Sequence, residues 1–442
     1  MAGEWRSCTI GELCEAGAVE LQTGPFGTQL HAHDYVEDGV PVVPTEAIRN
    51  RQIDHSVLPK ISLGKAEELA RHRLEPGDIL FARRGVQATG HIGCVRMAES
   101  GFLCGTGAIR LRVRGHDRNI SPDFLSHVLA NPASVEWFKF HAIGATMPNL
   151  NEGIIRSFPL KIPPLSEQRA IAQILGTLDD KIELNRRMNE TLEAIARALF
   201  KSWFVDFDPV RAKAEGRDPG LPRHIADLLP DSFEDSELGE IPKGWKVGTL
   251  SDVADHPRRG LQPNEIDPST PYIGLEHMQK RCISLADWGT SERLESNKFE
   301  FKRGEILFGK LRPYFHKVGV APMDGICSTD IVVIAPKAAK WFGFVLGHVF
   351  SDAFVEHTNA GSTGTKMPRT SWGDMARYSV VLPSEQVAAA FTSQMRAAVD
   401  RITASIHESH TLAALRDTVL PKLISGELRV LDGVRIVGGI AV

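Results

Sequence analysis

The stretches Pro164-Leu165-Ser166-Glu167-Gln168 and Leu382-Pro383-Ser384-Glu385-Gln386 match each other and decide the fold. Each opens a long segment with helical periodicity, and each follows a globular segment of the chain. A serine beside proline is a good helix start, because its hydroxyl accepts hydrogen bonds from the free backbone N–H groups of the first turn. The sequence therefore predicts two similar domains that alternate with two long helices, which would hold two similar binding surfaces a fixed distance apart.

The match continues through both halves of the chain in the same order, with an offset that decreases steadily. The matching positions include Trp5 with Trp245, Val40–Val43 with Thr270–Ile273, Gly77–Phe81 with Gly304–Phe308, Cys104 with Cys327, and Met147-Pro148 with Met367-Pro368. Chance matches would scatter instead. We infer a domain duplication with small deletions in the second copy, because a period this long excludes a solenoid.

Composition bounds the class of protein. A chain of 442 residues is too long for one core and suits two domains plus spacers. The net charge of -4 and a pI near 6.5 argue against non-specific coating of nucleic acid, which needs a large basic excess. Sequence-specific DNA binding needs only a local basic surface, so it stays open.

The cysteines and the N-terminus indicate where the protein works. The six cysteines form no Cys-x-x-Cys pair and have no histidine at ligand spacing, which favours buried thiols over a zinc site or disulfides. The first residues lack a basic and then apolar leader, and no apolar run is long enough to span a membrane. We expect a soluble protein inside the cell, in the cytoplasm.

Within each copy the pattern predicts an α+β domain. The segments Gly77–Phe81 and Gly304–Phe308 are turns followed by strands, and Ala108–Val113 and Ile331–Ile334 are rich in strand formers. Helical spacing follows over 122–141 and 339–357.

The first long helix is expected over Ser166–Phe204, which contains no proline. At about 1.5 Å per residue it would span roughly 57 Å. Its apolar residues follow alternating four- and three-residue steps, typical of a coiled-coil seam, and Asn185 in that seam would fix the register at a cost in stability. The seam positions are Ile174, Leu178, Asn185, Met188, Leu192, Ile195 and Leu199.

The second long helix is expected from Ser384 to about Thr418, before Pro421 breaks the pattern. Its stripe contains Phe391, Met395, Val399, Ile402 and Ile406. Either each helix packs on its own domain, or the two pair with each other. We favour an antiparallel coiled coil with pseudo-twofold symmetry, because two half-apolar stripes of similar length can bury one another.

This combination resembles the specificity (S) subunit of type I restriction-modification enzymes over essentially the whole chain. The matching residues are Pro163–Gln168, Lys201–Val210, Ile241–Trp245 and Leu423–Leu428. The resemblance implies target-recognition domains at 1–163 and 243–381, a first spacer helix at 164–206, a linker at 207–242, a second spacer helix with a C-terminal element at 382–428, and a tail at 429–442.

The resemblance also implies the function. Each domain would read one half of an asymmetric bipartite sequence in double-stranded DNA, and the spacer would dock two modification (methyltransferase) subunits. This chain would have no catalytic residue, metal or cofactor of its own. It would direct N6-adenine methylation and ATP-dependent cleavage, with S-adenosylmethionine, ATP and magnesium held by the modification and restriction (translocase/nuclease) subunits.

Candidate DNA contacts are polar or basic residues at matching places in the two copies. Arginine can clamp a phosphate or a guanine in bidentate fashion, and amides and hydroxyls suit base edges. The alternation of Arg110, Arg112 and Arg114 places them on one side of a strand, which is either a DNA surface or a solvated face. The candidates are Gln22, Thr23, Arg83, Arg84, Arg110, Arg112, Thr146 and Asn149 in the first copy, and Arg258, Arg259, Lys310, Arg312, Thr365 and Lys366 in the second. Ordinary turns and a hinge before each helix explain several of these positions equally well.

Motifs for catalysis do not occur. The sequence contains no Gly-x-x-x-x-Gly-Lys-Ser/Thr loop for ATP and no Asn-Pro-Pro-aromatic motif for base methylation. The acids Asp78 and Glu305 lack a second acid and a lysine at fixed spacing, so we interpret them as turn residues. Two alternatives remain: a standalone DNA nuclease, and a scaffold whose twin domains bind protein.

Overall fold

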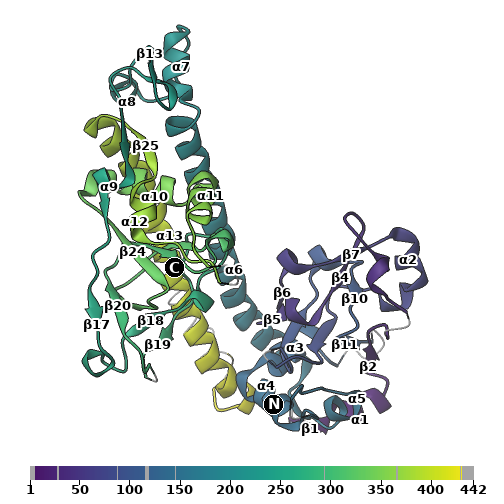
Figure 1. Ribbon diagram of the computed structural model, residues 1–442. Helices are drawn as coiled ribbons and strands as arrows, with labels where there is room; N and C mark the ends of the chain where they lie inside the picture. Colours follow the sequence, from purple (N-terminus) through teal and green to yellow (C-terminus); the bar gives the residue numbers. More distant parts are fainter. Residues whose placement is uncertain are drawn as a thin grey trace. The chain divides into compact units, whose positions relative to one another are not determined.

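The structure is a computed structural model that describes residues 5–26, 29–86, 88–114, 119–144, 146–292, 294–364, 367–428 and 430 (Figure 1). The chain forms two compact units: Met1–Lys181 with Thr411–Val442, and Ile182–His410. We call them unit 1 and unit 2. The N-terminal α+β domain, which we call domain 1, belongs to unit 1. Its second copy, domain 2, belongs to unit 2.

Domain 1 contains two four-stranded sheets. One has the antiparallel order β2-β11-β8-β9, and the other has the order β10-β4-β7-β3, in which β4 and β10 are parallel. The strands are β2 (Val19–Thr23), β3 (Tyr35–Val36), β4 (Val40–Val43), β7 (Lys60–Ile61), β8 (Ile79–Ala82), β9 (Ile92–Cys94), β10 (Leu103–Cys104) and β11 (Ala108–Val113). A small hairpin, β5 (Ile48–Arg49) and β6 (Gln52–Ile53), and helix α2 (Leu63–Glu68) complete it.

Domain 2 repeats the first sheet and the parallel strand pair of the second sheet, which has one more strand. Its four-stranded sheet has the order β16-β24-β21-β22, and its five-stranded sheet has the order β17-β20-β23-β18-β19, in which β18 and β23 are parallel. The strands are β16 (Ala254–Asp255), β17 (Gly260–Leu261), β18 (Pro271–Ile273), β19 (Gly289–Thr290), β20 (Lys298–Phe301), β21 (Ile306–Gly309), β22 (Val318–Val320), β23 (Gly325–Cys327) and β24 (Ile331–Pro336). The duplication inferred from the sequence is therefore present in the fold.

The matching Gly-acid-Ile-Leu-Phe stretches form the equivalent central strands β8 and β21, both wholly buried. Gly77 and Gly304 have φ of 94° and 82°, the left-handed region that favours glycine. In each turn the acid accepts a hydrogen bond from the backbone N–H three residues earlier, at 2.8 Å for Asp78 and 2.7 Å for Glu305. Both acids are thus turn residues, as the sequence indicates.

Helices cover both central sheets in the same way. They are α3 (Pro122–Ala130), α4 (Pro132–His141) and α5 (Glu152–Arg156) in domain 1, and α10 (Phe342–Val349), α11 (Asp352–Ala360) and α12 (Trp372–Ala376) in domain 2. Phe138 of α4 packs edge-on against Phe81 with 5.4 Å between ring centroids, and Phe354 of α11 packs against Phe308 at 5.6 Å. These T-shaped pairs hold equivalent helices on equivalent strands.

Each domain is closed by a strand pair at the start of a long helix. Strand β1 (Arg6–Thr9) pairs antiparallel with β12 (Pro159–Ile162), directly before α6 (Leu165–Phe204). Strand β15 (Lys246–Thr249) pairs with β25 (Ser379–Leu382), directly before α13 (Glu385–Ser425). Capped helices α1 (Ile10–Glu15) and α9 (Leu250–Val253) follow β1 and β15.

The glutamine of the first Ser-Glu-Gln motif fixes the start of α6 to domain 1. Gln168 is fully buried, and its side-chain amide donates to the carbonyls of Pro163 and Asn119 at 2.8 Å each. Its side-chain oxygen accepts from the N–H of Ser121 at 2.9 Å. The motif therefore joins helix and domain, which no other residue type of this size could do with the same donors and acceptor.

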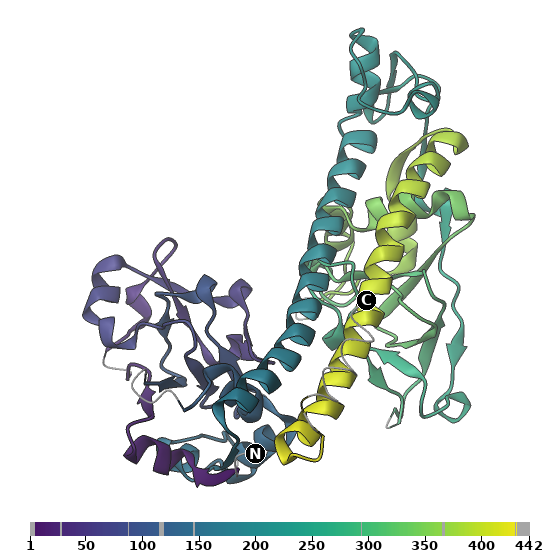
Figure 2. The ribbon, with the colours of Figure 1, turned by 180° about the vertical axis from the view of Figure 1, so that it is seen from behind.

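Within each unit, α6 and α13 run side by side and antiparallel (Figure 2). In unit 2 the Trp203 and Phe391 rings lie 5.4 Å apart, and Asn185 donates to Ser409 at 3.3 Å and to Glu408 at 2.7 Å. In unit 1 Arg416 donates to Asp179 at 2.9 Å. Residue numbers rise along one helix as they fall along the other, as expected for antiparallel pairing.

Most predicted seam residues are buried, with one correction. Ile174, Leu178, Asn185, Met395, Val399, Ile402 and Ile406 are buried, and Met188, Leu192 and Leu199 are half-buried. Ile195 is 48% exposed, whereas Ala196 beside it is buried, so the assignment of Ile195 was wrong. A straight helix drifts by about 20° per heptad from a strict seven-residue repeat, which moves the buried stripe to the next position.

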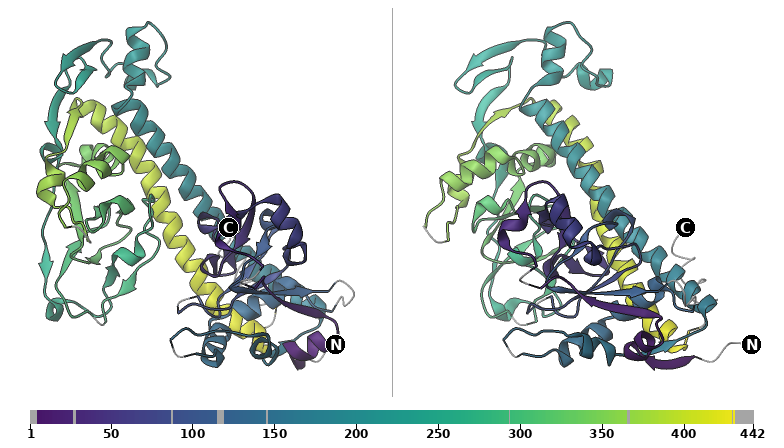
Figure 3. Two further views of the ribbon diagram at one scale, coloured as in Figure 1. Left: turned by 45° about the vertical axis from the view of Figure 1, so that its right-hand side comes forward. Right: turned by 90° about the vertical axis from the view of Figure 1, so that its right-hand side faces the viewer.

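The segment 207–242 also differs from the expected linker. It folds into α7 (Asp208–Ala214), α8 (Arg223–Ala226) and the hairpin β13 (Phe233–Ser236) and β14 (Gly239–Pro242), which gather together in unit 2 (Figure 3). Val210, Ile225 and Leu229 are buried in the same core as Trp245. These apolar residues are too sparse to be noticed along the sequence, but they converge in space.

All six cysteines are free, four of them buried and Cys14 and Cys282 half-buried. Burial raises the pKa of Cys104 to about 12. Among the described residues, no cluster of histidine, cysteine and acids could hold a metal ion. In the same part of the chain, every helix is too short or too polar to cross a bilayer.

Candidate nucleic-acid interface

The residues after β8 meet the Met-Pro loop of domain 1. We call residues 83–84 and 143–150 the first strand-end region. Ile143 and Asn149 pair across the loop, and Asn149 also pairs with Arg84. Arg83 donates from Nε to the side chain of Asn149 at 3.0 Å and to the carbonyl of Leu150 at 3.1 Å. The sequence candidates Arg83, Arg84 and Asn149 are thus brought together.

Domain 2 has the same construction, the second strand-end region, at residues 310–312 and 363–370. Thr363 pairs with Arg369, and Arg369 pairs with Leu311, as Ile143, Asn149 and Arg84 do in domain 1. The N–H of Thr370 donates to the carbonyl of Lys310 at 3.1 Å, which corresponds to the 2.7 Å bond from Leu150 to Arg83. Thr365 and Lys366, predicted contacts on this loop, lie outside the described residues.

The side chains in these regions differ in their exposure and in whether they already have hydrogen-bond partners. Arg84 and Thr146 are exposed, and neither side chain forms a hydrogen bond or ion pair with another described residue. Arg83 is half-buried and holds the loop in place. Arg312 has φ of 52°, and its guanidinium carbon lies 6.0 Å from the Phe315 ring centroid. Arg84 is therefore the cation of the first strand-end region whose side chain is exposed and without a partner among the described residues.

The candidates Gln22 and Thr23 lie at the end of strand β2. Gln22 is half-buried and lies opposite Arg110 in β11. The Thr23 hydroxyl donates to the carboxylate of Glu152 at 2.8 Å.

Arg110 and Arg112 stabilise domain 1 internally. Arg110 is 4% exposed and donates to the carbonyls of Arg71 and Arg73 at 3.3 and 3.1 Å. Arg112 donates to both carboxylate oxygens of Asp78, at 2.7 and 2.6 Å. Neither guanidinium presents its donors to solvent, so we leave both out of the interface proposed below. Alternation along a strand correctly put them on one side, but it could not say what covers that side.

In domain 2, Arg258 and Arg259 follow β16. Arg259 pairs with the carboxylates of Glu305 and Glu300. Arg258 is exposed and contributes to a cavity of about 280 Å³ together with Lys310, Thr370 and Trp372. The sequence comparison did not identify Thr370 and Trp372, because it searched for residues that match between the copies and these two do not.

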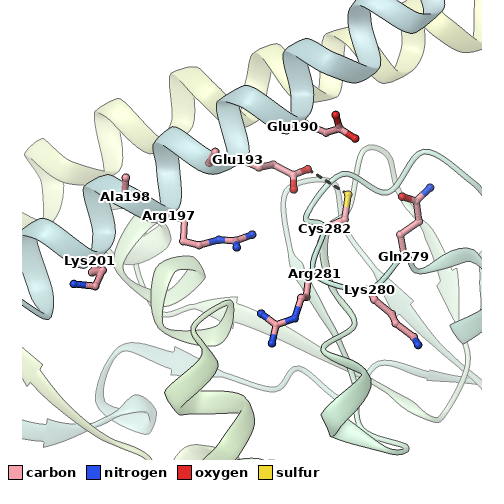
Figure 4. Close-up of a pocket in the computed structure, with 10 residues that line it drawn as sticks. Glu190, Glu193, Arg197, Ala198, Lys201, Gln279, Lys280, Arg281 and Cys282 are labelled. Carbon is pink, nitrogen blue, oxygen red and sulfur yellow. Dashed lines mark hydrogen bonds between the residues drawn. The ribbon is translucent and has the colours of Figure 1, made fainter. Parts of the chain in front are cut away.

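A larger cleft of about 490 Å³ lies in unit 2 between α6 and the loop 279–282 (Figure 4). Glu193 of α6 closes one side, because its carboxylate accepts from the N–H groups of Ile283 at 3.2 Å and Ser284 at 3.0 Å. Arg197 stacks on Phe350 at 4.8 Å, and Arg281 pairs with Asp352 at 2.8 Å. Glu193 and Arg197 thus attach domain 2 to the helix, whereas the Arg281–Asp352 pair lies within domain 2.

Comparisons with known proteins show what this chain is similar to. Residues 2–194 match the family described as the type I restriction modification DNA specificity domain. The specificity subunit of the type I restriction enzyme HindI of Haemophilus influenzae is 26% identical over 365 residues, which cover 70% of this chain and 78% of that protein. The MjaIX specificity subunit of Methanocaldococcus jannaschii is 26% identical over 332 residues, covering 71% and 72%.

A solved structure supports the fold. The crystal structure of the S subunit of a type I restriction-modification system from M. genitalium matches with a TM-score of 0.54 and 15% identity, covering 95% of this chain and 96% of that one. The resemblance to type I specificity subunits is therefore confirmed, together with the two-domain α+β fold that it implies.

Proposed function

We propose that this chain is the non-catalytic DNA specificity subunit of a type I restriction-modification complex, and that each domain reads one half of an asymmetric bipartite target. The duplicated strand-end regions carry this proposal. Both put a basic residue directly after a buried central strand, Arg83 after β8 and Lys310 after β21. Both also place a Met-Pro loop beside that residue.

The two regions share a backbone arrangement but not their side chains, which supports an asymmetric target. Asn149 of the first region corresponds to Arg369 of the second, since each pairs across its loop in the same way. Asparagine suits adenine edges in the major groove and arginine suits guanine. Two domains with different groups at one place would read different bases.

The chemistry would come from partner subunits. Relatives of this chain carry the name of specificity subunits of type I restriction enzymes. By that relationship, modification subunits would use S-adenosylmethionine to methylate adenine, and restriction subunits would use ATP and magnesium for cleavage. The complex would act in the cytoplasm, on the double-stranded DNA that it meets there.

The long helices would set the distance between half-sites. Two half-sites on one face of B-DNA lie about 34 Å apart or a multiple of that. The helices α6 and α13, of 40 and 41 residues, would serve as the spacer. The spacer would also provide the docking surface for two modification subunits.

Methylome sequencing of cells that express this chain with its modification subunits tests the proposal. We expect one methylated motif with two different half-sites and a fixed gap. Lys310→Ala should weaken methylation while subunit assembly stays intact. Methylation without sequence preference would refute the proposal. Cleavage of DNA by the purified chain with magnesium alone would establish a nuclease instead, and a complex without affinity for DNA would favour a protein scaffold.

A further inference from the structure

Domain 2 contains a cavity of about 280 Å³ at its strand-end region, which none of the comparisons assigns to a ligand. It lies between the loop after β16, strand β20 and the start of α12. The residues that matter are His256, Arg258, Phe299, Lys310, Thr370 and Trp372. Ligand sites for small molecules are usually about 300–1,000 Å³, so this cavity suits a single small ring system.

Three aromatic side chains form its walls. The His256 ring centroid lies 5.6 Å from that of Phe299 and 6.2 Å from that of Trp372. His256 donates from Nδ1 to the carbonyl of Val333 at 2.7 Å, which fixes its orientation. Burial lowers the pKa of His256, so the ring is neutral at pH 7. Neutral aromatic faces accept a planar heterocycle by stacking.

Three polar side chains of the cavity lack a partner among the described residues. Thr370 is 4% exposed, and its hydroxyl forms no hydrogen bond with any described residue. A buried hydroxyl without a partner costs free energy, which a ligand that hydrogen-bonds to it would recover. The side chains of Arg258 and Lys310 likewise form no hydrogen bond or ion pair within the described part of the chain, and they supply positive charge at the cavity.

At the equivalent place in domain 1, two of the polar side chains are paired within the domain. Glu152 begins α5 as Trp372 begins α12, and its carboxylate accepts a hydrogen bond from Thr23 at 2.8 Å. Arg83, the equivalent of Lys310, donates hydrogen bonds from its Nε to the Asn149 side chain and the Leu150 carbonyl. The cation that domain 1 holds internally, Arg83, is matched in domain 2 by Lys310, whose amine has no partner among the described residues, which argues for a ligand there.

We propose that this cavity receives one nucleobase of the DNA target, rotated out of the stack, with the adjacent phosphate on Arg258 and Lys310. The inference rests on the proposed function and names a specific contact within it. The base stacks against Trp372, and the Thr370 hydroxyl hydrogen-bonds to its edge. At the equivalent place in domain 1, Arg83 and Glu152 are paired within the domain, so we expect its half-site to be read there without extrusion.

Fluorescent base analogues test this directly in the assembled complex. Once the methylome has given the motif, duplexes carry 2-aminopurine or a cytosine analogue at each position of the second half-site in turn. Unstacking brightens these analogues. We expect one bright position besides the methylated base, which the partner methyltransferase extrudes for its own chemistry. Trp372→Ala should abolish the rise at the first position only and weaken DNA binding by about 5- to 150-fold.

Matched variants separate the outcomes. Trp372→Phe keeps an aromatic wall and should keep the rise, and Thr370→Val should reduce it without unfolding the domain. No bright position, or one that Trp372→Ala leaves unchanged, overturns the inference. If only Arg258→Ala and Lys310→Ala lose binding, the cavity binds a phosphate and no base, and this result also overturns the inference. Absence of any specific methylation in the unmodified complex would instead refute the proposed function.

Discussion

Asp179 gives a sharp test of how domain 1 is attached to its helices. This residue of α6 is 7% exposed, and its carboxylate pairs with Arg51 of domain 1 and accepts from Arg416 of α13 at 2.9 Å, all within unit 1. Arg51 also donates to the Ser126 hydroxyl at 3.1 and 3.0 Å. Asp179→Ala therefore removes the carboxylate that joins a domain, one helix and the other helix.

The expected cost follows from the burial of the guanidinium that is left behind. Breaking a buried ion pair by removal of one partner costs about 3–5 kcal/mol. Arg416 keeps Asp417 at 2.9 Å, whereas the Arg51 side chain is 11% exposed and loses its carboxylate. We expect the lower end, about 3 kcal/mol, or roughly 6–12 °C in the unfolding temperature of a unit of this size.

Asp180→Ala is the matched control. Asp180 is the next residue of the same helix, but its side chain is 76% exposed and lies 3.9 Å from Arg96, so its loss should cost less than about 1 kcal/mol. Calorimetry gives both values, and hydrogen exchange should locate the loosening of Asp179→Ala in peptides from 165–181 and 411–425. Equal destabilisation by the two variants would refute the reasoning.

Three further predictions concern pH, DNA binding and register. Burial lowers the pKa of His348 to about 3, below its unfolded value of 6.5, so its contribution to stability is complete above pH 6.5 and declines by about 1.4 kcal/mol per unit as the pH falls toward 3. Urea titrations at pH 7 and 5 should show a smaller drop for His348→Leu, and an unchanged drop would contradict the assignment. Arg84→Ala, which removes an exposed guanidinium, should lower the salt dependence of DNA binding by about one unit of slope and leave assembly unaltered, as anisotropy titrations at several salt concentrations would measure. Asn185→Leu replaces a buried amide that bonds to Glu408 and Ser409, and we expect equal or greater thermal stability but methylated sites with altered gaps; a single unaltered gap would argue against a role in register.

The fold was predictable where the signal is local and repeated. A glycine, an acid and a buried apolar strand specify turn and strand within five residues, so β8 and β21 could be placed from sequence. The fold of segment 207–242 could not be predicted, because Val210 and Leu229 are buried in a core that also contains Trp245 and forms only in the folded chain. Isolated apolar residues carry no periodicity to detect.

The candidate site was predictable to a smaller extent. Basic residues at matching positions led to Arg84 and Lys310, which the structure places in equivalent regions. The sequence could not predict which side chains already have partners within the fold. Arg110, for example, donates to the backbone carbonyls of residues 71 and 73, which are distant in sequence. Trp372 was not predicted, because Glu152 stands at the equivalent place in domain 1 and the two residues do not match. Such differences are nevertheless expected where two domains recognise different half-sites.

The strand pairs that close the domains have a consequence for how such a chain changes over time. In domain 1, Arg6 lies opposite Ile162, and in domain 2, Lys246 lies opposite Leu382, so each domain enters and leaves through neighbouring backbone positions beside a helix start. A recombination event with crossovers at those two points replaces a whole domain and leaves both helices unbroken. Such a replacement would keep both helices, but the incoming domain would need to supply the contacts that join each domain to its helix, such as Arg51 with Asp179 and the N–H groups of Ile283 and Ser284 with Glu193.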